Sequence, residues 1–244
     1  DRSVSRGLGD VYKRQVYNFE GEDVAKWLNS MGIAAFVLEC RLPSDEHDNA
    51  EDVPLIDAMR AMRVIRGRAQ EFGIDEAKIG VMGFSAGGFM AALLSTAYES
   101  DVYADYKYKD EYDKLSARPD FAVCSYPVIS IDDCIEAGKR YMSEEQVLER
   151  ISDGKAKILH KYNPDKLVRP DMPPVFICET DDDRTTLSEN SVGFYMAARK
   201  AGVSAELHIF RTGGHGYGCG DDFAQTGEWK VLFTKWIKSI GIIS

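Results

Sequence analysis

The sequence has neither a Lys/Arg-rich cluster nor an apolar run that approaches the roughly 18 residues of a membrane-spanning helix. Acidic residues outnumber basic ones by 40 to 30, which gives a formal net charge of −10 at pH 7. A chain with this charge lacks the electrostatic footprint of a protein that binds nucleic acid or an anionic membrane. We therefore predict that neither nucleic acid nor a membrane is a partner.

Cysteine is too sparse and too scattered for a disulfide framework or a Cys-x-x-Cys zinc site. The five cysteines are Cys40, Cys124, Cys134, Cys178 and Cys219. His47 lies among acidic residues, but no second histidine follows at ligand spacing, so we interpret this stretch as a solvated loop. The sequence thus predicts no metal site, and its odd, dispersed cysteines favour a reducing, cytoplasmic compartment.

Residues 1–15 (DRSVSRGLGDVYKRQ) lack any apolar period and join abruptly to ordinary domain sequence at Val16. A flexible tail or a cloning scar is one interpretation. The string also resembles the translation of a sequencing adapter, a contaminant of reading frames assembled from environmental DNA. We therefore expect residues 1–15 to be non-native and residues 16–244 to form one domain that is truncated at its N-terminus.

Helix-like and strand-like stretches alternate along the rest of the chain. Short apolar runs typical of strands buried on both faces of a parallel sheet cover residues 33–38, 78–82, 121–125, 175–178 and 206–210. Segments expected to be helical cover residues 22–31, 54–72, 89–97, 188–201 and 228–240. This alternation predicts an α/β fold with a doubly wound, mostly parallel sheet. Residues 98–113 and 129–174 do not follow this alternation of helices and strands. We interpret them as solvated connections or as a cap beside a site.

A Gly-x-Ser-x-Gly motif at residues 83–87 follows one predicted strand and precedes a helix rich in small residues. In this context the motif is typical of a sharp turn that lifts a serine hydroxyl, here that of Ser85, off the end of a sheet. Glycine two residues to either side lets the neighbouring backbone pack without a Cβ clash. A phosphate-binding loop is the rival interpretation, but no Lys-Ser/Thr pair follows the glycines.

A serine nucleophile needs a base, and His215 is the best of four candidates. It lies in a glycine-rich loop, residues 213–218, that follows the last predicted strand. We interpret His208, inside that strand, and His160, near the end of a helix-like stretch, as structural residues.

The base in turn needs a carboxylate, and three adjacent aspartates follow the predicted strand at residues 175–178. Acidic side chains at the carboxyl end of a parallel strand lie where sites form in open α/β sheets. The chain order Ser, Asp, His is the one expected of an α/β-hydrolase. Their chemistry alone does not choose among Asp181, Asp182 and Asp183. The alternative to a catalytic role is a cluster of negative charges at the N-terminus of the next helix.

Several stretches together resemble the acetyl-esterase branch of the α/β-hydrolases: residues 79–88 (IGVMGFSAGG), 115–121 (LSARPDF), 126–130 (YPVIS), 183–191 (DRTTLSENS) and 214–216 (GHG). Members of this branch include carbohydrate esterases that remove acetyl groups from xylan and its oligosaccharides. In such sequences the triad acid lies seven residues before the Asn of Glu-Asn-Ser, which selects Asp183, with Asp182 as the alternate. The resemblance therefore implies a Ser85–His215–Asp183 triad, an oligosaccharide or other small ester as substrate, and no cofactor.

The chain departs from this family pattern in its oxyanion hole. The backbone N–H of Ala86 supplies the first donor, whereas the glycine-rich loop of the second donor is missing before Phe19. Gly7 and Gly9 belong to the suspected adapter and are not substitutes. Since losing one donor typically costs about 10²–10³ in rate, we expect the chain as it stands to be impaired.

Two other functions remain open from the sequence. A peptidase of the prolyl-oligopeptidase type would share the same catalytic domain. A non-catalytic binding protein with a hydrolase fold is the second, although a binding module has no need of a serine, an acid and a histidine in this order.

Overall fold

A four-stranded parallel sheet forms the centre of the protein. The computed structural model describes residues 17–41, 51–147, 161–219 and 226–243. The strands lie in the order of the chain: β1 (Val81–Phe84), β2 (Ala122–Ser125), β3 (Val175–Thr180) and β4 (Ala205–Phe210). Each pairs in parallel with the next. The carboxyl ends of all four strands therefore lie at one edge of the sheet.

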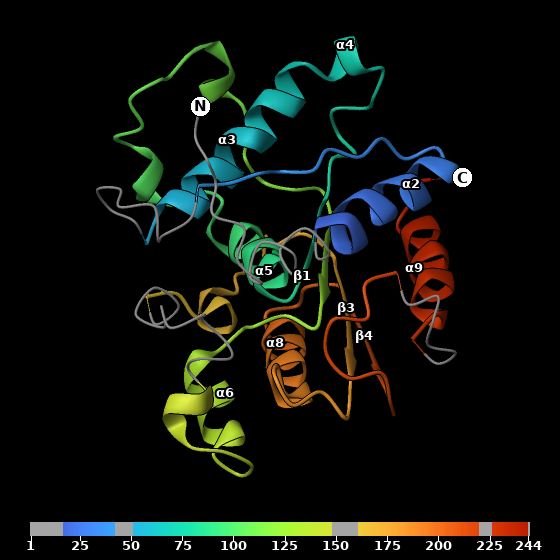
Figure 1. Ribbon diagram of the computed structural model, residues 1–244. Coiled ribbons are helices and arrows are strands. Elements are labelled where there is room, and N and C mark those ends of the chain that lie inside the picture. Colours follow the sequence, from blue (N-terminus) through green and yellow to red (C-terminus); the bar gives the residue numbers. More distant parts are fainter. Residues whose placement is uncertain (1–16, 42–50, 148–160, 220–225, 244) are drawn as a thin grey trace, which may run out of the picture.

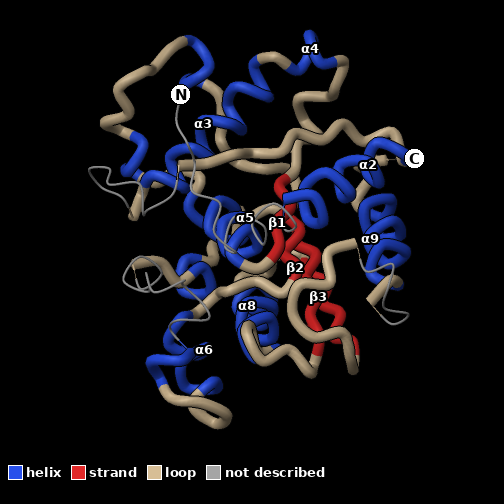
Figure 2. Tube along the Cα trace, in the orientation of Figure 1, coloured by secondary structure: helices blue, strands red, loops and turns tan. Residues whose placement is uncertain are grey.

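Helices cover both faces of this sheet (Figure 1). Helices α5 (Ala86–Ala97) and α8 (Ser188–Lys200) pack on one face, while α2 (Asp23–Ser30) and α9 (Glu228–Ser239) lie on the other (Figure 2). The remaining elements are η1 (Tyr17–Glu22), α3 (Val53–Gly67), α4 (Ala69–Phe72), η2 (Asp101–Tyr103), η3 (Glu111–Lys114), α6 (Ile131–Gly138) and η5 (Pro164–Leu167). Within the described ranges, no helix combines the length and apolar character needed to cross a membrane.

The central strands are apolar on both sides because both sides are covered. Ala122 and Cys124 of β2 belong to the core beneath α5 and α8. Val123, between them, packs with Phe176 of β3 in the core beneath α2 and α9. A parallel sheet buried in this way has near-continuous apolar strands, which confirms the predicted doubly wound α/β fold.

The prediction of a buried strand at residues 33–38 is wrong. This stretch carries no strand in the structure, and Phe36, Val37 and Leu38 are 46%, 44% and 49% exposed. The Phe36 ring lies 4.8 Å from the ring of Phe72. An apolar run becomes a strand only where a neighbouring strand pairs with it, and the described residues provide no such strand here.

Several boundaries differ from the prediction by a few residues: α5 begins at Ala86 rather than at residue 89, and β3 extends to Thr180 rather than to residue 178. Two further differences have a clear cause in the backbone. The ladder of β1 begins at Val81 rather than at residue 78, because the Ile79 N–H donates to the Asp120 carboxylate (2.9 Å) and the Val81 N–H to the Phe121 carbonyl (3.0 Å). The helix expected over residues 54–72 is divided into α3 and α4 at Arg68, whose φ and ψ are −108° and 16°.

Candidate active site

Ser85 occupies the turn between β1 and α5, in a strained backbone conformation. Its φ of 52° and ψ of −116° lie outside the regions that L-residues ordinarily adopt. The turn is held because the Ser85 N–H donates to the Ser125 carbonyl at 3.0 Å, and the Ser85 carbonyl accepts from the Phe89 N–H at 3.0 Å. These two hydrogen bonds hold the strained turn and so place Ser85 at the carboxyl end of the sheet.

Gly83 of the motif and Gly88, just beyond it, are needed for close approach of the backbone, whereas a Cβ on Gly87, the second glycine of the motif, would meet nothing within 4 Å. The clash expected at both motif glycines is therefore found at Gly83 and not at Gly87. A Cβ atom on Gly83 would lie 1.9 Å from the carbonyl oxygen of Gly87, and one on Gly88 would lie 2.9 Å from the Cβ of Pro127. Neither contact is tolerable without a backbone shift. This explains in physical terms why the turn carries small residues on both sides of Ser85.

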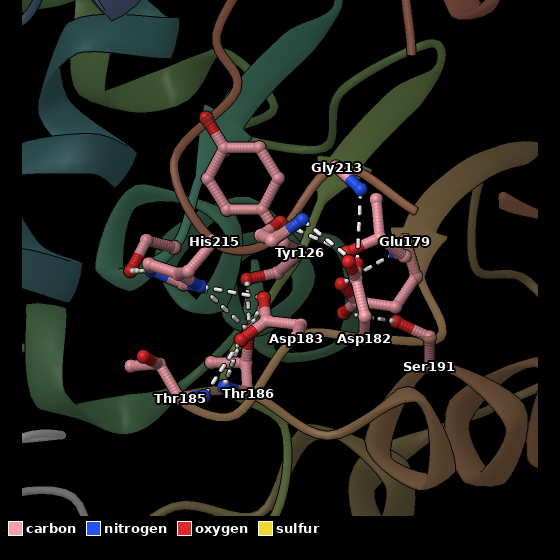
Figure 3. Close-up of polar contacts among 12 residues, drawn as sticks. Tyr126, Glu179, Asp182, Asp183, Thr185, Thr186, Ser191, Gly213 and His215 are labelled. Carbon is pink, nitrogen blue, oxygen red and sulfur yellow. Dashed lines mark hydrogen bonds and ion pairs between the residues drawn. The ribbon is translucent and has the colours of Figure 1, made fainter. Parts of the chain in front are cut away.

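The structure brings Ser85, His215 and Asp183 together in one chain of contacts, and Figure 3 shows how His215 and Asp183 face each other. The Ser85 Oγ lies 2.9 Å from His215 Nε2, and His215 Nδ1 lies 2.6 Å from Asp183 Oδ2. Because a carboxylate can only accept, the Nδ1 atom carries the proton and Nε2 is left to accept the hydroxyl proton of the serine. This is the arrangement of a nucleophile, a general base and an orienting acid.

Asp183 is buried and fully supplied with donors. Its Oδ1 atom accepts from the backbone N–H groups of Thr185 (2.7 Å) and Thr186 (3.0 Å), and its Oδ2 atom accepts from the Thr186 hydroxyl (2.9 Å). The same hydroxyl lies 3.1 Å from His215 Nδ1 and 3.2 Å from the Tyr126 carbonyl. Sequence reasoning missed this role of Thr186, because a hydroxyl in a turn gives no signal until its neighbours in space are known.

Asp182 and Asp183 have different partners. Asp182 Oδ1 accepts from the backbone N–H groups of Gly213 (2.9 Å) and Gly214 (2.8 Å), in the loop that carries His215. Asp182 therefore anchors the backbone of the histidine loop, whereas Asp183 contacts the imidazole itself. Of the two aspartates that the family resemblance had left open, only Asp183 contacts the imidazole, and its role as the triad acid stays a prediction.

Tyr126 is a second residue that sequence reasoning missed. It has a φ of 37°, which is uncommon for a residue with a side chain, and it is fully buried. Its hydroxyl donates to Glu20 Oε1 at 2.7 Å and accepts from the Gly218 N–H at 3.0 Å, and its ring centroid lies 5.0 Å from that of His215. Burial raises the pKa of the Tyr126 hydroxyl well above its usual value, so it stays a donor.

The remaining candidates divide between described and undescribed residues. Ala86 is the first residue of α5, so its N–H is one of the groups without a partner inside the helix, and its place in an oxyanion hole stays a prediction. His208 on β4 bonds to Glu206 (2.7 Å) and lies against Phe176, as expected of a structural residue. His47, His160 and residues 1–16 lie outside the described residues. In the part of the chain that the structure describes, no group of three or more His, Cys, Asp or Glu side chains is arranged to hold a metal ion.

A family comparison assigns the chain to a group of known proteins. The model of the BD-FAE family matches residues 12–197, which is more than half of the chain. The chain belongs to the BD-FAE family. This confirms the predicted relationship to acetyl esterases of the α/β-hydrolase fold.

Curated relatives and solved structures agree with this membership. An acetylxylan esterase of Xylanibacter ruminicola is 30% identical over 241 residues, which cover 98% of this chain and 46% of the relative. Endo-1,4-beta-xylanase B of Butyrivibrio fibrisolvens is 31% identical over 204 residues, which cover 83% and 30%. The acetyl ester-xyloside bifunctional hydrolase of Caldicellulosiruptor lactoaceticus has a TM-score of 0.73 at 39% identity, with 91% of this chain and 77% of that chain covered. The chain thus spans less than half the length of either curated relative.

Proposed function

We propose that the protein is a serine esterase that hydrolyses short acyl esters, chiefly O-acetyl groups on xylan-derived oligosaccharides. One observation carries the chemistry: a serine in a strained turn contacts an imidazole that is in turn oriented by a buried carboxylate. This arrangement activates a hydroxyl that would otherwise be a weak nucleophile at neutral pH. The proposal needs no metal and no organic cofactor.

In the first half of the reaction, Ser85 Oγ attacks the acyl carbonyl while His215 Nε2 takes the serine proton. Asp183 stabilises the imidazolium that forms, because its carboxylate faces Nδ1. The Ala86 N–H donates to the oxyanion of the tetrahedral intermediate. The intermediate collapses when His215 returns the proton to the departing sugar oxygen, which leaves an acyl group on Ser85.

In the second half, water takes the place of the sugar hydroxyl. His215 removes a proton from the water as it attacks the acyl-enzyme, and a second tetrahedral intermediate forms at the same donors. The proton then passes from His215 to Ser85 Oγ, and the carboxylate product leaves. The two half-reactions restore the starting protonation states, so the triad acts repeatedly.

The choice of substrate rests on the relatives. The names of three similar proteins refer to acetylxylan, to xylan and to an acetyl ester-xyloside. An acetyl group on a xylose hydroxyl is the ester that these names share. A prolyl-oligopeptidase-type activity uses the same triad and is the main enzymatic alternative, and a non-catalytic binding protein is the other.

The test is to assay the 244-residue chain with an acetylated xylo-oligosaccharide, p-nitrophenyl acetate and a proline-containing peptide. Because the sequence predicts that one of the two oxyanion donors is missing, we expect this chain to release acetate and p-nitrophenol slowly and to cleave no peptide. We expect Ser85→Ala to lower kcat by about 10⁴–10⁶-fold relative to the same chain. Ser30→Ala changes an exposed serine of α2 and should have no effect. Full activity of Ser85→Ala would refute the mechanism.

A fluorophosphonate probe separates the alternatives without a substrate. It reacts covalently with an activated serine, so wild-type protein should be labelled and Ser85→Ala should not. A non-catalytic binding protein would leave both proteins unlabelled. Cleavage of the peptide in place of the esters would favour the peptidase.

A further inference from the structure

A fully buried carboxyl group lies next to the triad and has no part in the chemistry described above. Glu179 is the fifth of the six residues of β3, and its side chain is 0% exposed. Its Oε1 atom accepts from the Thr180 N–H at 2.9 Å, and its Oε2 atom accepts from the Ser191 hydroxyl of α8 at 3.3 Å. Among the described residues, no cation forms an ion pair with it.

Glu179 and Asp183 are a pair of neighbouring buried carboxyl groups. Both side chains are buried, and they lie next to each other in the site, close enough for the charge of one to act on the other (Figure 3). Figure 3 places Glu179 on the side of Asp183 that faces away from His215. Two adjacent carboxylates in a buried site cannot both be ionised without a large electrostatic cost, so one of them carries a proton.

The supply of donors decides which of the two is protonated. Asp183 accepts two backbone N–H groups, the Thr186 hydroxyl and the His215 N–H, and all four favour its charged form. Glu179 accepts only one N–H and one hydroxyl. The proton therefore belongs to Glu179, because Asp183 is much better stabilised as an anion.

The electrostatic surroundings agree with this assignment. Burial raises the pKa of Glu179 well above its ordinary value of about 4.5, and the charge of Asp183 raises the pKa further. The other titratable groups that face Glu179 are Cys178 on its own strand, Cys134 of α6 and Tyr217 of the loop after β4. Burial raises the pKa of all three, so they are neutral at pH 7 and offer Glu179 no countercharge.

We propose that Glu179 is a positioning residue of the triad: it is a neutral carboxylic acid that donates a hydrogen bond to Asp183 from the side opposite His215. The inference rests on the triad of the proposed function. The protonated side chain ties Asp183 to β3 and, through Ser191, to α8. If Glu179 were ionised, it would repel Asp183 and loosen the contact between Asp183 and the imidazole.

The protonation state can be tested through stability alone. We compare the melting temperatures of wild type and Glu179→Gln from pH 4 to pH 9, with Asp181→Asn as a control on an exposed carboxyl of the neighbouring loop. Near pH 4 the glutamate is mostly protonated in folded and unfolded chains, so its contribution is small there. As the pH rises, the unfolded chain releases this proton and the folded chain keeps it, so wild type loses stability relative to Glu179→Gln.

We expect the melting temperature of Glu179→Gln to exceed that of wild type by about 3 °C or more at pH 8, with a smaller gap near pH 4. Asp181→Asn should show no such pH-dependent gap. A constant difference between Glu179→Gln and wild type at all pH values would overturn the assignment of the proton.

The positioning role is tested by activity and by labelling. The side-chain amide introduced by Glu179→Gln can accept from the Thr180 N–H through its oxygen and donate through its nitrogen to Asp183 and to a reoriented Ser191 hydroxyl, so kcat should stay within about 3-fold of wild type. Glu179→Ala removes the proposed hydrogen bond to Asp183, and we expect kcat to fall about 10-fold or more at an unchanged KM. At alkaline pH, where Glu179 ionises, the activity of wild type should fall earlier than that of Glu179→Gln.

A third readout keeps this inference separate from the proposed function. The Nδ1 proton of His215, observed by NMR, should be unchanged in Glu179→Gln and shifted or exchange-broadened in Glu179→Ala. If wild type neither hydrolyses esters nor reacts with the fluorophosphonate, the proposed function fails while this signal still tests the role of Glu179. An unperturbed signal and an unchanged kcat in Glu179→Ala would overturn the inference, as would equal losses in both variants.

Discussion

Two loops at the carboxyl edge of the sheet hold the acid and the base in different ways. The acid loop, residues 181–187, itself supplies most of the hydrogen-bond donors to its carboxylate. Asp183 is buried and takes three of its hydrogen bonds from Thr185 and Thr186 of the same loop. An acid held in this way keeps its orientation as long as the turn itself is formed.

The histidine loop, residues 211–219, depends on anchors that belong to other segments. Three of its glycines, Gly214, Gly216 and Gly218, have φ values of 63°, 80° and 47°, which favour residues without a side chain. Asp182 binds the Gly214 N–H, and Tyr126 binds the Gly218 N–H. The base is thus placed by distant residues, and the comparison teaches that its position is the more vulnerable of the two.

The largest expected effect distinguishes the two adjacent aspartates. Asp183→Asn removes the charge that faces His215 Nδ1 and permits the wrong tautomer, so we expect kcat to fall by about 10³–10⁴-fold. Steady-state kinetics with p-nitrophenyl acetate measures this loss.

Asp182→Asn is the matched control for this prediction. The amide oxygen of the new side chain can still accept from the Gly213 and Gly214 N–H groups, so we expect a loss of less than about 10-fold. If Asp182→Asn lowered kcat by about 10³-fold or more and Asp183→Asn by less than about 10-fold, Asp182 would be the triad acid.

An intermediate effect is expected at the anchor of the histidine loop. Tyr126→Phe keeps the ring beside His215 but leaves the buried Gly218 N–H and the Glu20 carboxyl without their partner. We expect kcat to fall about 10-fold, and chemical denaturation should show a loss of about 1–3 kcal/mol in the free energy of unfolding.

Tyr217→Phe provides the comparison for Tyr126→Phe. The Tyr217 ring is buried 4.5 Å from that of Tyr126, and its hydroxyl has no nitrogen or oxygen partner in the described part of the chain. Removal of this hydroxyl should leave kcat unchanged. Equal losses in the two variants would show that packing, rather than the anchoring bond, is responsible.

The smallest effect is expected inside the acid loop. Thr186→Val removes the single hydroxyl donor that lies within reach of both Asp183 Oδ2 and the Tyr126 carbonyl, while the two backbone donors to Asp183 remain. We expect kcat to fall about 3–10-fold and the unfolding free energy to fall by about 1 kcal/mol. Thr185→Val should leave kcat unchanged, since Thr185 contributes its backbone N–H. If Thr186→Val lowered kcat more than Tyr126→Phe does, the acid loop would be the more vulnerable of the two loops.

Much of the fold could be predicted because its signals are local. Apolar runs and helical periods depend on neighbours in the sequence, and they predicted all four strands of the sheet and the helices on both faces. The stretch at residues 33–38 has the same composition but is not a strand, since a strand also requires a partner that composition does not specify.

The residues around the site were only partly predictable. Ser85 and His215 both lie among glycines, which mark them in the sequence. The sharp turn at Ser85 depends on the close backbone approach that Gly83 permits. Tyr126, Thr186 and Glu179 have no such local mark. Each becomes significant only through the side chains or backbone groups that it meets in the folded chain.

The sequence by itself determined the order of strands and helices, the sharp turn at Ser85 and the glycine-rich backbone around His215, because these depend on side-chain size and polarity over a few residues. Tertiary structure alone decided that Asp183 faces the imidazole while Asp182 binds the loop backbone. It also decided that a buried glutamate adjoins Asp183. The physical reason is that hydrogen bonding and burial depend on which atoms meet in space, and parallel strands bring together residues that are distant in sequence.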